Sequence, residues 1–317
     1  MPIIIPYTTE EEWLNHRLDD ITSTDVSALF GLSPYTTEYE VFYNKKNRIN
    51  PDFAETDRMK WGKRFEDVIA QGVAQDLGLT VEPLKVYMRH STVKGMGSSF
   101  DYAIVGHQDG PGLMEIKNVD ARIYRDKWSD SEAPAHIETQ VQHQMEVADA
   151  AWCLIVAMSG GNDPRVIRRE RDRDIGKALC KRVSKFWRDV ESDNIPTPDY
   201  IKDAEFIIGL HRSAGVNLLE VDTESAVYKL LVDYEHLSAE ARSYEALTKA
   251  KKAEILDVIG DDYNKVKGGE FTLSCGTTKD TPPTIITPEM VGTEIGGRKG
   301  YRMCKLAKRG GLNDLLR

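Results

Sequence analysis

The chain has 317 residues and carries 51 acidic against 42 basic side chains, which gives a net charge of −9 at neutral pH. A chain of this length can bury one large hydrophobic core or two smaller ones. The acidic balance excludes a surface that is basic overall, as many DNA-binding domains have, so any nucleic-acid surface has to be local.

The cysteines and the chain start bear on the cellular compartment. Four cysteines, at positions 153, 180, 275 and 304, form no C-x-x-C pair and are too scattered for a zinc site or a disulfide framework. We expect them to be reduced. Residues 1–6 are too short for a signal peptide, and no apolar run approaches the length of a membrane span. These features predict a cytoplasmic protein without a membrane segment.

The first strong pattern in chain order is helical. Apolar residues four positions apart predict a helix over residues 58–77 with one buried stripe, made by Trp61, Phe65, Ile69, Val73 and Leu77. Glu66 lies beside this stripe. Spacing alone favours the interpretation of Glu66 as a solvated acid at the edge of an apolar helix face.

A β-hairpin is predicted next. Residues 97–105 are rich in strand-forming side chains, a glycine-rich turn follows at 106–112, and residues 113–118 complete a return strand. Two strands joined in this way pair antiparallel, so side chains of both strands meet on a common face.

This hairpin carries the most informative residues of the chain. Because side chains alternate across a strand, Glu115 and Lys117 share one face, Ile116 points into the core on the other, and Asp101 can meet the pair from the partner strand. Two carboxylates that lie close together both stay ionised at low free-energy cost only when a cation is bound. Oxygen ligands of this hard type favour Mg²⁺ or Mn²⁺. The lysine can orient or help deprotonate an attacking water and offset charge on phosphorus. The alternative is an exposed strand pair with a solvated Glu and Lys.

A second helical stripe precedes an apolar strand at residues 152–158. Its inward positions are Ile137, Val141, Met145 and Ala148. Gln140 lies off this stripe, where an amide is more often solvated. His143 is either a structural histidine or a ligand, and no second histidine or cysteine stands at metal spacing near it.

Four sequence blocks occur in the order and spacing of a known family. They are Ile21–Pro34, Trp61–Glu66, Ser99–Tyr102 with Leu113–Lys117, and Pro134–Met145. Over roughly its first 190 residues the chain resembles the lambda exonuclease and YqaJ-like viral recombinase family, within the restriction-endonuclease-like PD-(D/E)XK nucleases. Four blocks in sequence are a far more specific signal than any one of them.

The resemblance implies specific site residues. It implies a site for Mg²⁺, with Mn²⁺ as a substitute, made by Glu66, Asp101, Glu115 and the backbone carbonyl of Ile116. It places two residues beside the reacting water or phosphate, Lys117 and Gln140. It also implies that the 5′ phosphate of a DNA end is gripped by Arg17 and Thr24.

The chain departs from the family at points that bear on this grip. Thr24 stands where the family has a serine, and a hydroxyl beside free backbone N–H groups at a helix start is still a sound phosphate site. Asp19 and Asp20 replace a small residue and put two negative charges near Arg17. The hydroxyls at residues 22–24 can alternatively cap a helix that runs into Val26. In the later helical block, Ile137 replaces an aromatic residue.

Local basic segments could supply the positive surface that the whole chain lacks. About ten Lys and Arg stand against three acids in residues 165–188, and residues 298–309 are basic as well. Such segments could line a positive groove for DNA. The alternative is a solvated face with alternating charges, which we favour for Asp172, Arg173, Asp174 and Lys177.

The order of elements predicts an α/β fold with a restriction-endonuclease-like PD-(D/E)XK core, in which helices flank a mixed central sheet. We place this exonuclease core at residues 1–195, before a Pro-containing linker, and a C-terminal extension at 196–317. The extension holds a helical arm at about 222–259 with a heptad seam, and a small β element at about 266–307.

The resemblance thus predicts a phage-type alkaline exonuclease. We expect Mg²⁺-dependent 5′ to 3′ degradation of one strand of double-stranded DNA, leaving 3′ single strands for recombination by strand annealing. Expected partners are DNA ends, a single-strand annealing protein and further copies of the chain in a ring. The alternatives are another PD-(D/E)XK deoxyribonuclease, such as a RecB-like or structure-specific endonuclease, and a relict DNA-end binding protein.

Overall fold

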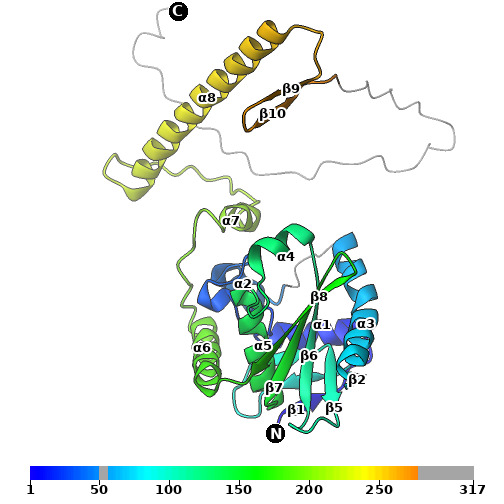
Figure 1. The fold of residues 1–317 in the computed structure, drawn as a ribbon. Helices are drawn as coiled ribbons and strands as arrows, with labels where there is room; N and C mark the ends of the chain where they lie inside the picture. Colours follow the sequence, from blue (N-terminus) through cyan, green and yellow to red (C-terminus); the bar gives the residue numbers. More distant parts are fainter. Residues whose placement is uncertain (50–55, 278–317) are drawn as a thin grey trace, which may run out of the picture. The chain divides into compact units, whose positions relative to one another are not determined.

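The computed structural model describes residues 1–49 and 56–277, which form two units, Met1–Ile207 and a second that begins at Ile208. The first unit is built on a five-stranded sheet (Figure 1). In spatial order its strands are β2 (Thr80–Pro83), β5 (Tyr102–Val105), β6 (Gly112–Val119), β7 (Trp152–Ser159) and β8 (Asp163–Glu170). Only β6 and β7 run parallel, so the sheet is mixed, as predicted.

Helices cover both faces of this sheet. Figure 1 shows α3 (Asp57–Leu77) on one side of the sheet and α5 (Ala135–Ala148) on the other. Met114 and Ile116 of β6 belong to the core cluster that contains α3 residues, and Leu113 belongs to the cluster that contains α5 residues. Strand alternation therefore directs Glu115 and Lys117 to the α5 side of the sheet.

The predicted strand at residues 97–105 is two strands in two different sheets. β4 (Gly97–Ser99) pairs with β3 (Tyr87–Arg89), which in turn pairs with β1 (Ile3–Ile5). β5 leaves that small sheet and pairs antiparallel with β6, so the hairpin itself is confirmed. The break falls between Ser99 and Tyr102, which puts Asp101 at the junction of the two sheets.

The N-terminal region contains two helices. α1 (Glu10–Asp19) begins with a capping box between Thr9 and Glu12, and α2 (Glu38–Lys46) begins with a Thr37 cap. The predicted helix from residue 22 to Val26 and beyond is wrong. Residues 23–27 form turns, followed by a single 3₁₀ turn at Ala28–Phe30.

Local side-chain hydrogen bonds explain why that helix does not form. The carboxylate of Asp25 accepts from the backbone N–H of Thr22 at 3.1 Å and from its hydroxyl at 2.8 Å. Such short-range bonds offer the backbone an alternative to helical pairing. None of the three hydroxyls at positions 22–24 serves as the cap of a regular helix.

The buried stripe of α3 is shorter than predicted. Ile69 and Val73 are buried, but Trp61, Phe65 and Leu77 are 48%, 42% and 49% exposed. The two aromatic rings stack on each other at a centroid distance of 5.3 Å. The sheet covers only the central part of the helix, so the correct period holds over fewer turns than the sequence suggests.

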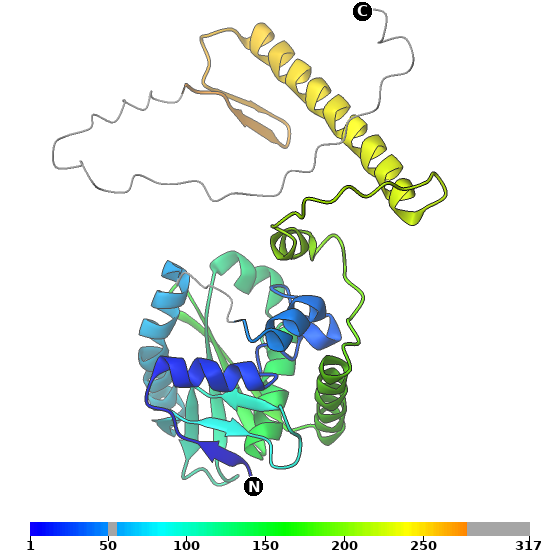
Figure 2. The ribbon, with the colours of Figure 1, turned by 180° about the vertical axis from the view of Figure 1, so that it is seen from behind.

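The remaining elements of the first unit close its α5 side. α4 (Ala121–Lys127) lies between β6 and α5 in the chain, and α6 (Arg173–Glu191) packs on α5 and α2 through buried Val183 and Phe186. In the rear view of Figure 2, α1 lies in front of the main sheet, with the small sheet below it. The stripe of Ile137, Val141 and Met145 on α5 is buried, as predicted.

The second unit contains a long helix and a hairpin. α7 (Ala204–Leu210) spans the boundary between the units, and α8 (Ala226–Ile259) covers most of the arm expected at 222–259. β9 (Lys265–Gly268) pairs with β10 (Phe271–Ser274) where a single strand was expected, and the expected strand at 300–306 lies outside the described residues. The assignment of separate roles to 1–195 and 196–317 stays a prediction.

Three of the four cysteines lie among the described residues. Cys153 is buried, Cys180 and Cys275 are partly buried, and all three are free thiols, while Cys304 lies outside the described residues. Among the helices of the part of the chain that the structure describes, none combines the length and apolar character needed to cross a membrane.

Candidate active site

The structure brings three acids and one lysine of the predicted site into mutual electrostatic contact. Burial, followed by the charge of Glu115, raises the pKa of Asp101 well above its usual value and also raises the pKa of Glu66. Burial would lower the pKa of Lys117, but the carboxylates of Glu115 and Asp101 outweigh it and raise that pKa. These residues come from α3, the sheet junction and β6, far apart in sequence.

Glu115 is the most firmly held of the four. Its side chain is buried, and its Oε1 accepts hydrogen bonds from Lys117 Nζ and from Gln140 Nε2, the latter at 2.6 Å. Its Oε2 accepts a hydrogen bond from Gln144 Nε2 at 2.7 Å. Gln140 is only 6% exposed, so the interpretation of a solvated amide on a helix shoulder is wrong.

Gln144 is a residue of the acidic site that was not predicted from the sequence. The available signal was its position one helical turn after Gln140, since residues four apart on a helix lie on the same face. The pattern Gln-x-x-x-Gln therefore places two amides side by side, although the sequence does not say that both face Glu115.

Asp101 is fixed by the backbone of β6. Its Oδ2 accepts a hydrogen bond from the N–H of Ile116 at 2.7 Å. The side chain of Ile116 is buried on the opposite, α3 side of the sheet. The backbone at Ile116 thus reaches the acidic site while its side chain serves the core, which is compatible with a role of its carbonyl as a ligand.

The donor set of this site fits a hard divalent cation. Glu66, Asp101, Glu115 and a backbone carbonyl offer only oxygen, the ligand atom that Mg²⁺ and Mn²⁺ prefer. The raised pKa of Asp101 indicates negative charge that the protein compensates incompletely and that a cation would relieve. The three carboxyl groups do not all lie within 4.8 Å of one another, so direct binding of one ion by all three requires them to move closer together.

Another cluster contains residue types that bind metals, but the proton of its histidine lies on the nitrogen that faces the cluster. His90, Glu146 and Cys180 are the one group of three such residues, within the described ranges, whose ligand atoms lie within 4.8 Å of one another. His90 Nδ1 accepts from the backbone N–H groups of Thr92 at 3.2 Å and Val93 at 3.0 Å. A neutral ring then carries its proton on Nε2, the atom that faces Glu146 at 3.6 Å. With its proton on Nε2, the ring directs no free lone pair at this cluster, in which Cys180 Sγ lies 3.9 Å from His90 Nε2 and 3.9 Å from Glu146 Oε1.

His143 does not belong to either site. It is fully buried, and this burial lowers its pKa to about 3, so the ring is neutral. The structural interpretation of His143 is therefore the one that the coordinates support.

The two residues predicted to grip a phosphate lie together. Arg17 Nη2 donates to the hydroxyl of Thr24 at 3.0 Å, and that hydroxyl also hydrogen-bonds Thr22 at 3.0 Å. The Arg17 guanidinium lies 4.8 Å from the ring centroid of Trp13. Thr24 is exposed and Arg17 is partly exposed, so both are accessible from solvent. Arg17 also interacts with Asp25, and Lys45 and Arg17 lower the pKa of this carboxyl against the effect of burial.

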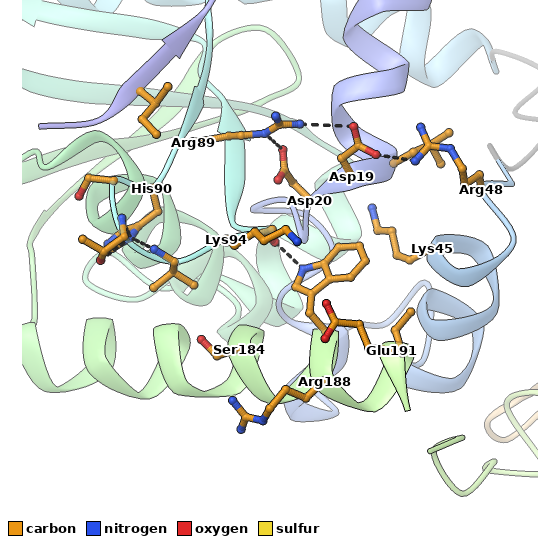
Figure 3. A pocket seen from close by; sticks show the side chains of 18 residues that line it. Asp19, Asp20, Lys45, Arg48, Arg89, His90, Lys94, Ser184, Arg188 and Glu191 are labelled. Atoms are coloured by element: carbon orange, nitrogen blue, oxygen red, sulfur yellow. Dashed lines mark hydrogen bonds and ion pairs between the residues drawn. The ribbon is translucent and has the colours of Figure 1, made fainter. Parts of the chain in front are cut away.

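Asp19 and Asp20 are neutralised by other arginines. Figure 3 shows Arg89 bridging both acids, with Arg48 on the far side of Asp19, in the wall of a cavity of about 810 Å³. The Arg89 Nε to Asp20 Oδ2 distance is 2.6 Å. Because Asp19 and Asp20 are paired with arginines, their charges repel a phosphate at Arg17 less than the sequence suggests.

Ser99 connects the predicted phosphate site to the acidic site. Trp13 Nε1 donates to the Ser99 hydroxyl at 2.7 Å, and Gln144 Nε2 donates to the Ser99 carbonyl at 3.3 Å. Trp13 supports Arg17, and Gln144 supports Glu115. The two predicted subsites are therefore held through one residue of β4.

The basic segment at 165–188 contributes less free positive charge than expected. Seven of its ten cations form ion pairs with acids: Arg165, Arg168, Arg169, Arg171, Lys177, Arg182 and Lys185. Asp172 caps α6 by accepting from the N–H groups of Asp174 and Ile175. The alternative of a charge-paired face is supported here, and the segment at 298–309 lies outside the described residues.

Comparison with known proteins adds a family and a fold. Residues 12–151 match the model of the YqaJ-like viral recombinase domain. The uncharacterized protein YqaJ of Bacillus subtilis (strain 168) is 24% identical over 249 residues, which cover 78% of this chain and 76% of that protein.

Among solved structures, LHK-Exo in complex with dAMP superposes with a TM-score of 0.50 at 20% identity, covering 62% of this chain and 98% of that one. A further structure of LHK-Exo, an alkaline exonuclease from Laribacter hongkongensis, has a TM-score of 0.49 with the same identity and coverage. The fold is thus the mixed α/β fold of the PD-(D/E)XK nucleases, as predicted.

Proposed function

From the premise that residues 12–151 form a YqaJ-like viral recombinase domain on a PD-(D/E)XK fold, we propose that this protein is a Mg²⁺-dependent deoxyribonuclease acting from DNA ends. The observation that carries the proposal is the partly buried site in which Glu66, Asp101 and Glu115 all interact electrostatically with Lys117. Three acids and a lysine on an α/β scaffold suit the hydrolysis of a phosphodiester.

The residues of the chain take distinct roles in this proposal. Glu66, Asp101 and Glu115, with the carbonyl of Ile116, would hold Mg²⁺, or Mn²⁺ in its place. When bound, the cation polarises the phosphate and activates water for attack. Lys117, whose raised pKa keeps it an ammonium, stabilises the negative charge that grows on the phosphate oxygens.

Gln140 and the phosphate grip position the reactants. Gln140 donates to Glu115 and so orients its carboxylate within the site. Arg17 presents a planar guanidinium suited to bidentate contact with a phosphate, and Thr24 supplies a hydroxyl next to it. Because Ser99 joins the two subsites, a 5′-terminal phosphate held at Arg17 would set the position of the next phosphodiester.

The finer activity follows the resemblance of the domain. We propose 5′ to 3′ removal of nucleotides from one strand of double-stranded DNA, leaving 3′ single strands for a single-strand annealing protein. A ring of several copies around the DNA stays a prediction. A structure-specific or RecB-like endonuclease is the second candidate, since the same four residues would serve it.

A linear duplex labelled at either end tests the proposal directly. The full-length protein in Mg²⁺ is expected to release the 5′ label first and to leave the 3′ label on long single strands, and EDTA should stop the reaction. A covalently closed plasmid serves as the control, because an enzyme that needs ends leaves it intact. Rapid cutting of the closed circle would support the endonuclease instead.

Removal of the Arg17 side chain should affect phosphorylated ends selectively. Arg17→Gln is expected to slow digestion of a 5′-phosphorylated duplex by about tenfold to a hundredfold, because a charge-assisted hydrogen bond is lost. Digestion of a 5′-hydroxyl duplex should change little. Initial rates on the two substrates measure the effect, and Arg122→Gln, at an exposed arginine of α4, is the matched control. Equal slowing on both ends would show that Arg17 does not recognise the phosphate.

A further inference from the structure

The helix α5 carries three buried glutamine side chains. Gln140, Gln142 and Gln144 are 6%, 6% and 2% exposed. A buried amide is costly unless its donors and acceptor are paired, so each of these residues requires an explanation from its contacts.

Gln142 is explained by structure alone. Its Nε2 donates to the carbonyl of Glu170 at 3.0 Å, and its Oε1 accepts from the N–H of Asp172 at 2.9 Å. Both ends of this amide therefore bind backbone groups between β8 and α6. Gln142 joins α5 to the following turn and does not contact the acidic site.

Gln144 shows the opposite pattern. Its Nε2 donates both to Glu115 Oε2 at 2.7 Å and to the Ser99 carbonyl at 3.3 Å. Both partners are acceptors only, so the amide cannot be turned around without placing oxygen against oxygen. In this orientation Gln144 Oε1 is buried and has no hydrogen-bond partner among the residues that the structure describes.

An unpaired buried acceptor costs stability, so the contribution of this glutamine lies in the hydrogen bonds of its Nε2 to Glu115 and Ser99. Gln140 and Lys117 both bind Oε1 of Glu115, whereas Gln144 binds Oε2. Donors on both oxygens fix the rotation of the carboxylate about its terminal bond, which sets the direction of its remaining lone pairs.

We infer that Gln144 is a positioning residue that holds Glu115 in the orientation needed to bind a divalent cation. This inference rests on the proposed metal-dependent function. Groups that hydrogen-bond a metal ligand typically change metal affinity by about 10- to 100-fold when removed. The contact with Ser99 extends this support to the side of the site where Trp13 and Arg17 lie.

The test compares Gln144→Met with Gln142→Met in the full-length protein. Methionine is close to glutamine in size and removes only the amide. The Mn²⁺ dissociation constant is measured by electron paramagnetic resonance of free Mn²⁺, and thermal unfolding is followed in EDTA. Gln144→Met should weaken Mn²⁺ binding by about 10- to 100-fold while its unfolding temperature in EDTA falls no further than that of Gln142→Met. Gln142→Met should unfold at a lower temperature and bind Mn²⁺ as the wild type does.

The outcomes separate this inference from the proposed function. If Gln144→Met binds Mn²⁺ with wild-type affinity, the inference is overturned and the proposed function stands. If the wild type binds no Mn²⁺, both are overturned. Should Gln144→Met fail to fold, Gln144→Asn keeps the polarity with a shorter reach, and weakened Mn²⁺ binding in that variant supports the inference while unchanged binding overturns it.

Discussion

Lys117→Met is expected to lower the rate of DNA cleavage by about a thousandfold, because it removes an ammonium group that interacts with all three acids of the site. Without a bound cation, Glu115 and Asp101 raise the pKa of Lys117, so its side chain is an ammonium at neutral pH. A group that is already protonated stabilises charge on the phosphate and does not accept the proton of water. Single-turnover digestion of a linear duplex in saturating Mg²⁺ measures the effect.

Metal binding distinguishes this role from a structural one. Lys117→Met should bind Mn²⁺ at least as tightly as the wild type, since the lysine competes with the cation for Glu115. Lys127→Met, at an exposed lysine of α4, is the matched control and should keep full activity. A Lys117→Met enzyme within tenfold of the wild-type rate would contradict the assignment.

The parts of the site that could be predicted depend on short-range geometry. Alternation along β6 is a local property, so the common face of Glu115 and Lys117 followed from the sequence, and the hairpin brought Asp101 to them. The departure of β4 into another sheet did not follow from the hairpin pattern, because β4 pairs with residues 87–89, which precede the hairpin, in a sheet that distant residues 3–5 complete.

Some predictions were wrong because the spacing of a sequence pattern was right, but its extent in the fold is set by tertiary contacts. The stripe on α3 has the right spacing, yet Trp61 and Phe65 are exposed because the period does not tell where the sheet ends. At residues 22–25, the competition between side chain and backbone hydrogen bonds overrode a plausible helix start. Gln144 was missed for a related reason, since its function depends on Glu115, which is distant in sequence and opposite in the fold.

Asp101→Asn is expected to separate stability from metal binding. Burial and Glu115 raise the pKa of Asp101, so the folded state holds a proton that the unfolded chain, with a carboxyl pKa of about 4, releases. The stability contribution of a group with a raised folded pKa is present below the unfolded pKa and is lost as pH rises through the folded pKa. In EDTA, this residue therefore destabilises the wild type progressively as pH rises above about 4.

The asparagine removes that charge and keeps an oxygen that can accept from the N–H of Ile116. At pH 8 in EDTA, thermal unfolding of Asp101→Asn should occur about 2–4 °C above the wild type, the shift that corresponds to roughly 1 kcal/mol for a domain of this size. Added Mn²⁺ should raise the unfolding temperature of the wild type and leave the variant unchanged, and cleavage should be lost. Asp76→Asn, at an exposed acid of α3, should show neither effect. A variant that is less stable than the wild type at pH 8 in EDTA, or that is still stabilised by Mn²⁺, would show that Asp101 is not a metal ligand whose charge the fold leaves uncompensated.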